Sequence, residues 1–228
     1  TDPHHGVGFT ILNDKAGPIN RFALSASYAY HLPIGERTSL AAGAALGIQN
    51  ISLRPASLDF GPAYPVDPVV ANSAYINKLK PDISAGIWVY SANWFAGLAA
   101  QQIVPQRIGF SNGKLGGDSV TIINGRLVPH LFMQAGYKLF LTDDISFLPS
   151  FTAKYVNPVP LSFDFNAKFQ YRDIIWAGAS IRTGDGISGM IGLNVNSNFN
   201  ISYAYDYNTS LLNTVSSGTH EIVIGFLL

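Results

Sequence analysis

The sequence predicts an all-β fold, a transmembrane antiparallel β-barrel with about twelve strands in this chain. Three observations lead to this prediction. Only 12% of the 228 residues are charged, whereas an ordinary soluble domain has about 25%. Apolar and polar side chains alternate with a period of two along most of the chain. The connections between the alternating segments are short and long in turn. We therefore expect a single barrel domain over residues 1–228.

The composition excludes several classes of function. The chain has 14 Lys and Arg against 14 Asp and Glu. It therefore lacks the surplus of basic residues that is typical of proteins that bind nucleic acids. Cysteine is absent, which excludes a disulfide scaffold, thiolate metal sites and a cysteine nucleophile. Because aromatic residues reach 12%, such a weakly charged chain needs an apolar solvent or a very large core.

The alternating segments predict the strands in chain order. The clearest runs from Leu161 to Tyr171, where every second side chain is Leu, Phe, Ala or Tyr and those between are polar. Segments 145–156 and 199–207 repeat the pattern. Extending it predicts strands near 6–12, 19–32, 39–52, 82–91, 94–104, 127–140, 145–156, 161–171, 174–183, 187–196, 199–207 and 219–228.

One stretch offers a different interpretation. No formal charge lies between Ile83 and Gln106, so a hydropathy scan could identify a membrane helix there. The stretch contains several Ser, Asn and Gln residues, and Ala92-Asn93 looks like a turn. We therefore expect two strands of about 10 residues, the length that crosses a bilayer in a barrel.

The charges inside the predicted strands favour a lumen. Each lies on the face opposite the main apolar row of its strand, and a charge facing lipid at mid-depth would cost about 2–4 kcal/mol. These charges are Arg21, Lys138, Lys154, Asp164, Lys168, Arg182, Asp206 and Glu221. Asp164 and Lys168 share one face two pleats apart, so we consider an ion pair between them.

The lengths of the connections predict the orientation of the barrel. With the C-terminus in the periplasm, the long connections near 53–81, 105–126 and 208–218 all lie outside the cell. The short connections near 92–93, 141–144, 172–173 and 197–198 then lie in the periplasm. The turn near 184–186 is external although it is short. The alternative is a soluble β-sandwich or barrel, whose outward faces would be polar.

No catalytic or cofactor chemistry is expected. The five histidines lack ligand spacing, so we predict no metal site. His130 belongs to a predicted inward row and has no nucleophile that the sequence can pair with it. Ser111 to Asp118 resembles a phosphate loop faintly, but its spacing is wrong and Leu115 replaces the magnesium-binding hydroxyl residue. We expect a surface loop there.

The start of the chain is not a signal peptide, because no basic segment precedes an apolar one. Since an outer-membrane protein is exported, we expect the chain to be mature or to lack its N-terminal part.

Motifs near both ends of the chain carry a family resemblance. The first is a glycine-bearing strand from Gly6 to Leu12, followed by Asn-Asp and Gly17, and then Tyr28-Ala29-Tyr30-His31. The last is Tyr203-Ala204-Tyr205-Asp206, a Ser-Leu-Leu loop, and Gly218-Thr219-His220-Glu221. Trp176 to Arg182 adds a Trp-x-Gly-x-x-x-Arg strand. Together they resemble the PorP/SprF family of type IX secretion membrane proteins from Bacteroidetes.

The resemblance implies a non-enzymatic outer-membrane barrel of the type IX secretion and gliding machinery. Such a protein supports export or surface anchoring of a large adhesin through the adhesin's C-terminal sorting domain, and some members are linked to a periplasmic peptidoglycan-binding component. Family members usually begin with an Asn-Pro-Ala-Tyr-Ala-Gly segment and further strands, so we expect a native barrel of about fourteen strands.

The residues that we expect to contact a partner face the lumen: Arg21, Lys154, Asp164, Lys168, Arg182, Asp206 and Glu221. The alternative for each is a lumen ion pair that only stabilises the barrel. For the protein as a whole, the alternatives are a passive porin and an outer-membrane enzyme that would use His130 or another lumen group.

Overall fold

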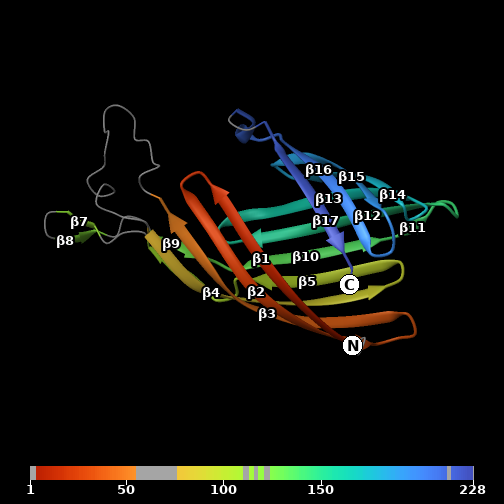
Figure 1. Ribbon diagram of the computed structural model, residues 1–228, viewed down its shortest axis with the longest axis horizontal. Coiled ribbons are helices and arrows are strands. Elements are labelled where there is room, and N and C mark those ends of the chain that lie inside the picture. The colour runs from red at the N-terminus through yellow and green to blue at the C-terminus, as the bar shows by residue number, and fades with distance from the viewer. Residues whose placement is uncertain are drawn as a thin grey trace. The chain divides into compact units, whose positions relative to one another are not determined.

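The computed structural model describes residues 4–54, 76–109, 113–115, 118–120, 124–214 and 217–227, and its regular structure is antiparallel β-strand (Figure 1). The helix in this part of the chain is one 3-10 turn, η2 (Leu211–Thr214). Among the described residues no helix is long and apolar enough to cross a membrane. The predicted all-β class is confirmed, and two strands cover the uncharged stretch after Asp82.

Eleven of the twelve predicted strands are present, with ends that differ from the prediction by up to several residues, and the twelfth, over 127–140, is interrupted. The long strands are β1 (His5–Ala16), β2 (Ile19–Pro33), β3 (Thr38–Leu53), β4 (Ile76–Ser91), β5 (Trp94–Gln101), β10 (His130–Tyr137), β12 (Ile145–Val156), β13 (Val159–Tyr171), β14 (Ile175–Arg182), β15 (Gly186–Asn194), β16 (Phe199–Asn208) and β17 (Thr219–Phe226). Each pairs with the next in this order, so the sheet is a continuous meander.

The segment predicted as one strand over 127–140 is interrupted. It contains the end of β9 (Asn124–Leu127), then β10, then β11 (Leu139–Phe140), which pairs with β12. Pro129 lies in the first interruption, where its missing N–H cannot contribute to a ladder. Periodicity alone did not predict these breaks, because the side chains continue to alternate across them.

The connection predicted over 105–126 is more regular than expected. It contains two ribbons, β6 (Gln106–Gly109) with β9, and β7 (Gly113–Leu115) with β8 (Asp118–Val120). The phosphate-loop-like segment falls on the second ribbon and partly outside the described residues. The connection predicted over 53–81 is shorter than expected because β4 begins at Ile76, and the remainder lies mostly outside the described part.

The turn predicted at Arg172-Asp173 is confirmed. Arg172 (φ 49°) and Asp173 (φ 54°) both have left-handed backbone conformations, and the N–H of Ile174 donates to the carbonyl of Tyr171 over 2.9 Å. Two central residues with positive φ make a type I′ turn, whose twist matches that of the flanking strands. Asp tolerates this conformation better than most residues.

The chain divides into two compact units. The first comprises Thr1–Leu32, Ala41–Ile87 and Ala99–His130, and the second comprises Pro33–Leu40, Trp88–Leu98 and Leu131–Leu228. In the second unit β12 to β17 lie side by side (Figure 1), and their registers place residues in rows across the strands.

The rows of the second unit divide by chemistry between the two faces of its sheet. One row on the face that we call the polar face is Ser150, Asn166, Ser180, Ser188, Asp206 and Thr219. One row on the opposite, apolar face is Phe147, Phe169, Ala177, Ile191, Tyr203 and Ile222. The alternation in sequence therefore becomes a separation of whole faces.

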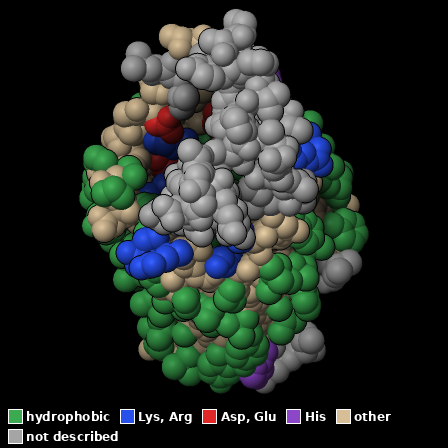
Figure 2. Space-filling model, turned by 90° about the vertical axis from the view of Figure 1, so that its left-hand side faces the viewer, with side chains coloured by type: hydrophobic (Ala, Val, Ile, Leu, Met, Phe, Trp, Pro, Cys, Tyr) green, Lys and Arg blue, Asp and Glu red, His purple; other side chains and the backbone are tan. Residues whose placement is uncertain are grey.

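Burial on these faces is the reverse of that in a soluble protein. On β13, Phe165 is 56% exposed whereas the adjacent Asp164 is 8% exposed. Among the described residues the buried hydrophobic side chains are only Ala41, Ile51 and Ala153. In Figure 2 hydrophobic side chains cover the lower part of the face shown, and Lys and Arg side chains lie above them. A soluble sandwich would bury its apolar rows, so that alternative does not fit.

Gly192 shows how closely the polar face is packed. It lies opposite Trp176 on β14, and an added Cβ would fall on the indole ring. We expect Gly192→Ala to lower the free energy of unfolding by about 1–3 kcal/mol through overpacking. Urea unfolding in detergent micelles, followed by circular dichroism, measures the change.

Gly189→Ala is the matched control on the same strand, because its Cβ would meet nothing within 4 Å. It should change stability by less than about 0.5 kcal/mol. Trp176→Leu should recover part of the loss in the Gly192→Ala background. Equal losses for the two glycine variants would contradict the packing argument.

Candidate functional site

An ionic network centred on Asp164 occupies the polar face of the second unit. Asp164 Oδ2 lies 2.5 Å from Lys154 Nζ, and Asp164 Oδ1 lies 3.2 Å from Arg182 Nε. Arg182 Nη1 also lies 3.0 Å from Asp185 Oδ2 in the turn after β14. We call these four residues the Asp164 network. Three strands and a turn supply them, so the network depends on correct pairing of β12, β13 and β14.

The cations of the Asp164 network remain partly accessible. The Asp164 side chain is 11% exposed, against 32% for Lys154 and 37% for Arg182. The two cations and two carboxylates balance in charge. Because an ammonium group has three donors and a guanidinium has five, Lys154 and Arg182 retain N–H groups beyond their ion pairs. These groups can donate to carbonyl or carboxylate oxygens of a bound polypeptide.

A row of small polar side chains lies beside the network. Asn166 is two residues from Asp164 on β13, opposite Ser150 on one side and Ser180 on the other. The row continues through Ser188 to Asp206. Hydroxyl and amide groups both donate and accept hydrogen bonds, so this row suits the backbone of an extended polypeptide.

The ion pair considered between Asp164 and Lys168 is wrong. Lys168 Nζ lies 4.3 Å from the centroid of the Trp176 ring, a cation–π contact, whereas Asp164 pairs with Lys154 and Arg182. Residues four apart on a strand are separated by about 13 Å, beyond reach of a direct pair. Neighbouring strands instead bring partners within 4 Å.

Asp206 and Glu221 do not join the network. Asp206 lies opposite Ser188 and Thr219, and Glu221 lies opposite Ala204 on the edge strand β17, where it is exposed. Neither carboxylate forms an ion pair with another of the described residues. Both lie on the polar face of the sheet, where Asp206 is partly exposed.

Arg21 belongs to the first unit. Its Nε is buried and has no hydrogen-bond partner within the described part of the chain, as is true of Asp82 Oδ1 and Gln102 Oε1 in the same unit. Gln49, which is 1% exposed, accepts a hydrogen bond from Gln102 Nε2 at 3.5 Å. The first unit therefore contains buried polar side chains, among them Gln49 and Gln102, that are separate from the Asp164 network.

The motif residues near the chain ends form two similar contacts. His5 Nδ1 lies 2.7 Å from the hydroxyl of Tyr28, and its ring packs on Tyr30. In the second unit, His220 Nδ1 lies 2.7 Å from the hydroxyl of Tyr203. The His220 ring also lies 4.8 Å from that of Tyr205. In both places a histidine on an edge strand packs against the Tyr-x-Tyr pair of the neighbouring strand.

Gly218 allows β17 to begin where it does. Its φ is +109°, a conformation that favours glycine, and an added Cβ would crowd the carbonyl of Asp206 and the hydroxyl of Tyr205. The Tyr205 hydroxyl donates to the carbonyl of Ser217 over 2.6 Å. The Gly-Thr-His-Glu and Tyr-x-Tyr-Asp motifs therefore form one packed unit.

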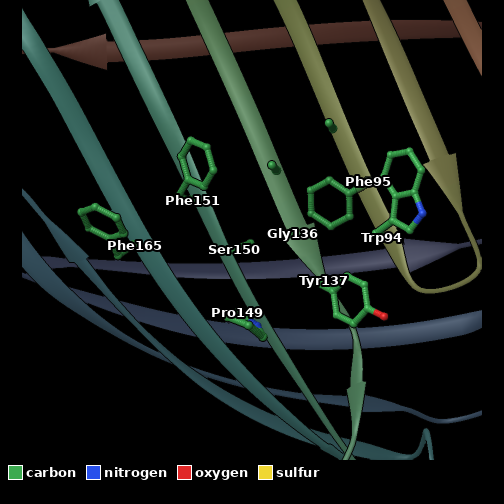
Figure 3. Close-up of a pocket in the computed structure, with 10 residues that line it drawn as sticks. Trp94, Phe95, Gly136, Tyr137, Pro149, Ser150, Phe151 and Phe165 are labelled. Carbon is green, nitrogen blue, oxygen red and sulfur yellow. The ribbon is translucent and has the colours of Figure 1, made fainter.

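The apolar face of the second unit has a groove of about 560 Å³ (Figure 3). Ala96 and Ala135 lie between larger neighbours, including Trp94, Tyr137 and Phe165. The small side chains create the depression because the residues around them project further from the sheet. It belongs to the apolar face and adds no polar group to the candidate site.

The geometry gives no support to hydrolysis at His130. Its Nδ1 lies 2.9 Å from the carbonyl of Val128, two residues away in the same chain. No group of three or more His, Asp or Glu residues suited to a metal ion lies among the residues that the structure describes.

Sequence reasoning identified three members of the Asp164 network and missed the fourth. Asp185 lies in the predicted turn Gly184-Asp185-Gly186. There it was interpreted only as a residue type that favours turns. Its position three residues after Arg182 was the available signal, because a tight turn returns that side chain toward the strand end. The contact between Lys168 and Trp176 had no signal, since it depends on the register of β13 and β14.

The chain matches a known protein family. None of the curated proteins matches the chain. The family model described as type IX secretion system membrane protein PorP/SprF matches residues 1–226, nearly the whole chain. The match includes both histidine–tyrosine motifs and the strands between them. The chain therefore belongs to the PorP/SprF family of type IX secretion system membrane proteins.

Proposed function

We propose that this protein is a closed outer-membrane β-barrel that supports export and surface anchoring of a large secreted adhesin, without catalysis. The observation that carries the proposal is the reversed burial of the second unit. Apolar side chains are exposed where lipid would lie, and a charged network is sheltered on the opposite face. Family membership supplies the secretion context.

Closure of the barrel follows from the chemistry of a bilayer. Within the described chain β1 pairs with β2 alone and β17 pairs with β16 alone. Lipid cannot satisfy open backbone edges, each unpaired group costing several kcal/mol. In the proposed barrel the edges of β1 and β17 are closed by strand pairing, directly or through further strands.

The Asp164 network lies at the external end of the proposed barrel. With the C-terminus in the periplasm, the turn that contains Asp185 faces outward, as do the long connections. In the proposed complex, Lys154 and Arg182 donate to the adhesin's C-terminal domain, the polar row accompanies its backbone, and Asp206 and Glu221 meet its basic groups. Arg21 in the first unit and Lys168 in the second are further candidates for contacts with the partner.

The test is affinity purification of the full-length protein from its own outer membrane in mild detergent, with mass spectrometry of what accompanies it. We expect a large secreted protein at near-stoichiometric amounts, together with a periplasmic peptidoglycan-binding component. Lys154→Glu with Arg182→Glu should reduce recovery of the secreted protein at least tenfold, since two charge-assisted contacts are lost.

Lys154→Arg with Arg182→Lys is the matched control, because it preserves both charges and should retain the secreted protein. Heat-modifiable mobility in gels verifies that each variant is folded. Unchanged recovery with the double charge reversal would exclude these two residues from the contact.

A passive porin is the second candidate, favoured by the row of hydroxyl and amide groups on the polar face. Such a barrel would be recovered alone and would conduct ions in planar bilayers. Weak ion selectivity would be expected, because the Asp164 network balances two cations against two carboxylates.

A further inference from the structure

Two arginines face each other on a ribbon of the first unit. In the pairing of β6 with β9, Arg107 lies directly opposite Arg126. Directly opposed residues of an antiparallel pair project from the same face, and like charges in such positions destabilise the pairing. Both side chains are exposed. A ribbon with only four residue pairs has little else to offset this repulsion.

No anion among the described residues compensates this pair. Within the described part of the chain, neither guanidinium forms an ion pair with a carboxylate. The guanidinium groups of two directly opposed arginines present up to ten N–H donors in planar forks, which match the oxygen spacing of phosphate. A phosphate group between the two side chains would accept hydrogen bonds from both guanidinium groups and neutralise their like charges. We call Arg107 and Arg126 the clasp.

The ribbon is joined to an apolar wall. The Gln106 side chain donates to the carbonyl of Pro81 on β4, which fixes the base of β6 to that strand. Ile103 and Val104, just before the ribbon, are exposed, and so is Leu79 on β4. Arg107 therefore lies three residues after side chains suited to lipid, and Arg126 is paired with it. A membrane protein meets charged headgroups at the end of its lipid-facing surface.

We propose that Arg107 and Arg126 bind a phosphate group of a phosphorylated glycolipid in the outer leaflet of the membrane. This inference rests on the proposed barrel and its orientation, which place the connection between β5 and β10 outside the cell. The lipid's acyl chains lie against Ile103, Val104 and Leu79, while its phosphate bridges the two guanidinium groups. Phosphate offsets the like-charge repulsion, so lipid binding also stabilises the ribbon.

The experiment uses the full chain in detergent and measures binding of diphosphorylated lipid A by native mass spectrometry. Arg107→Gln with Arg126→Gln should weaken binding about 100-fold, roughly tenfold for each charge-assisted contact. Lys15→Gln is the matched control, because Lys15 is an exposed cation at the external end of a strand in the same unit, and its cross-strand partner is the uncharged Asn20. It should change binding less than about threefold.

Dephosphorylated lipid A and inorganic phosphate are the remaining probes. The wild-type chain should bind the dephosphorylated lipid as weakly as the double variant binds the intact lipid. Full displacement of the lipid by an excess of inorganic phosphate would overturn the lipid assignment in favour of a soluble anion site. Equal binding by wild type and double variant would overturn the site itself.

Failure of the barrel and failure of the clasp are distinguishable. A wild-type chain without heat-modifiable mobility in detergent would contradict the proposed barrel, and with it the clasp. A chain that has this mobility but binds intact and dephosphorylated lipid A equally well would contradict the clasp alone.

Discussion

Replacing Asp164 with Asn is expected to lower the free energy of unfolding by about 2 kcal/mol, among the largest effects of a conservative substitution in this protein. Removing one member of a fully buried ion pair costs about 3–5 kcal/mol, because the remaining charge stays unpaired. Asp164 is nearly buried, but Lys154 and Arg182 are about one-third exposed, so water compensates part of the loss. Urea unfolding in detergent micelles measures the difference.

Two further variants separate the ion pairs from the change of residue type. Asp206→Asn removes a carboxylate from the same face without breaking an ion pair among the described residues, and should change stability by less than about 0.5 kcal/mol. Adding Lys154→Met and Arg182→Met to Asp164→Asn should restore much of the loss, because neither cation is then left without its carboxylate. A similar loss for Asp164→Asn and Asp206→Asn would show that the network contributes nothing specific.

Replacing Phe165 with Arg should cost about 2–4 kcal/mol in a bilayer, because the exposed side of this residue faces lipid in the proposed barrel. Phe165 lies between Phe151 and Ile181, both on the apolar face. In a water-soluble protein the same change at a residue that is 56% exposed would be nearly neutral. The sign and size of the effect therefore distinguish lipid from water as the surrounding solvent.

Asn166→Arg is the control for this prediction. Asn166 is the next residue on β13 and projects from the polar face, between Ser150 and Ser180. In the proposed barrel its side chain faces the lumen, so we expect a loss of no more than about 1 kcal/mol. Refolding into vesicles, followed by denaturant titration of both variants, gives the comparison. Equal losses would argue against lipid on the apolar face.

The strands and their faces could be predicted from sequence because both follow from a local rule. Alternate side chains on a strand point to opposite sides whatever the neighbours are, so Phe165 and Asp164 had to separate. The exposure of the apolar face could also be anticipated, since the charges lie consistently on the other face. The breaks around β10 escaped prediction because they leave the alternation of side chains unchanged.

The partners of each charge depend on information that alternation does not contain. Register between β12, β13 and β14 follows from the turns that join them, and a shift of two residues would keep every face while exchanging every partner. This explains why Asp164 was matched with Lys168 instead of Lys154 and Arg182. The ribbon of β6 and β9 was missed for a related reason, because its short strands have too few residues to establish a period.

The edges of β1 and β17 that have no partner strand among the described residues also bear on the time course of assembly. The hairpins from β12 to β17 join residues that are close in sequence, so they can form early. In the proposed barrel, pairing at the edges of β1 and β17 is the final step, and direct pairing of these strands would join residues almost a full chain length apart. Until that step, both edges can pair with strands of other molecules. The yield of folded barrel therefore depends on whether the edges close faster than the chains aggregate.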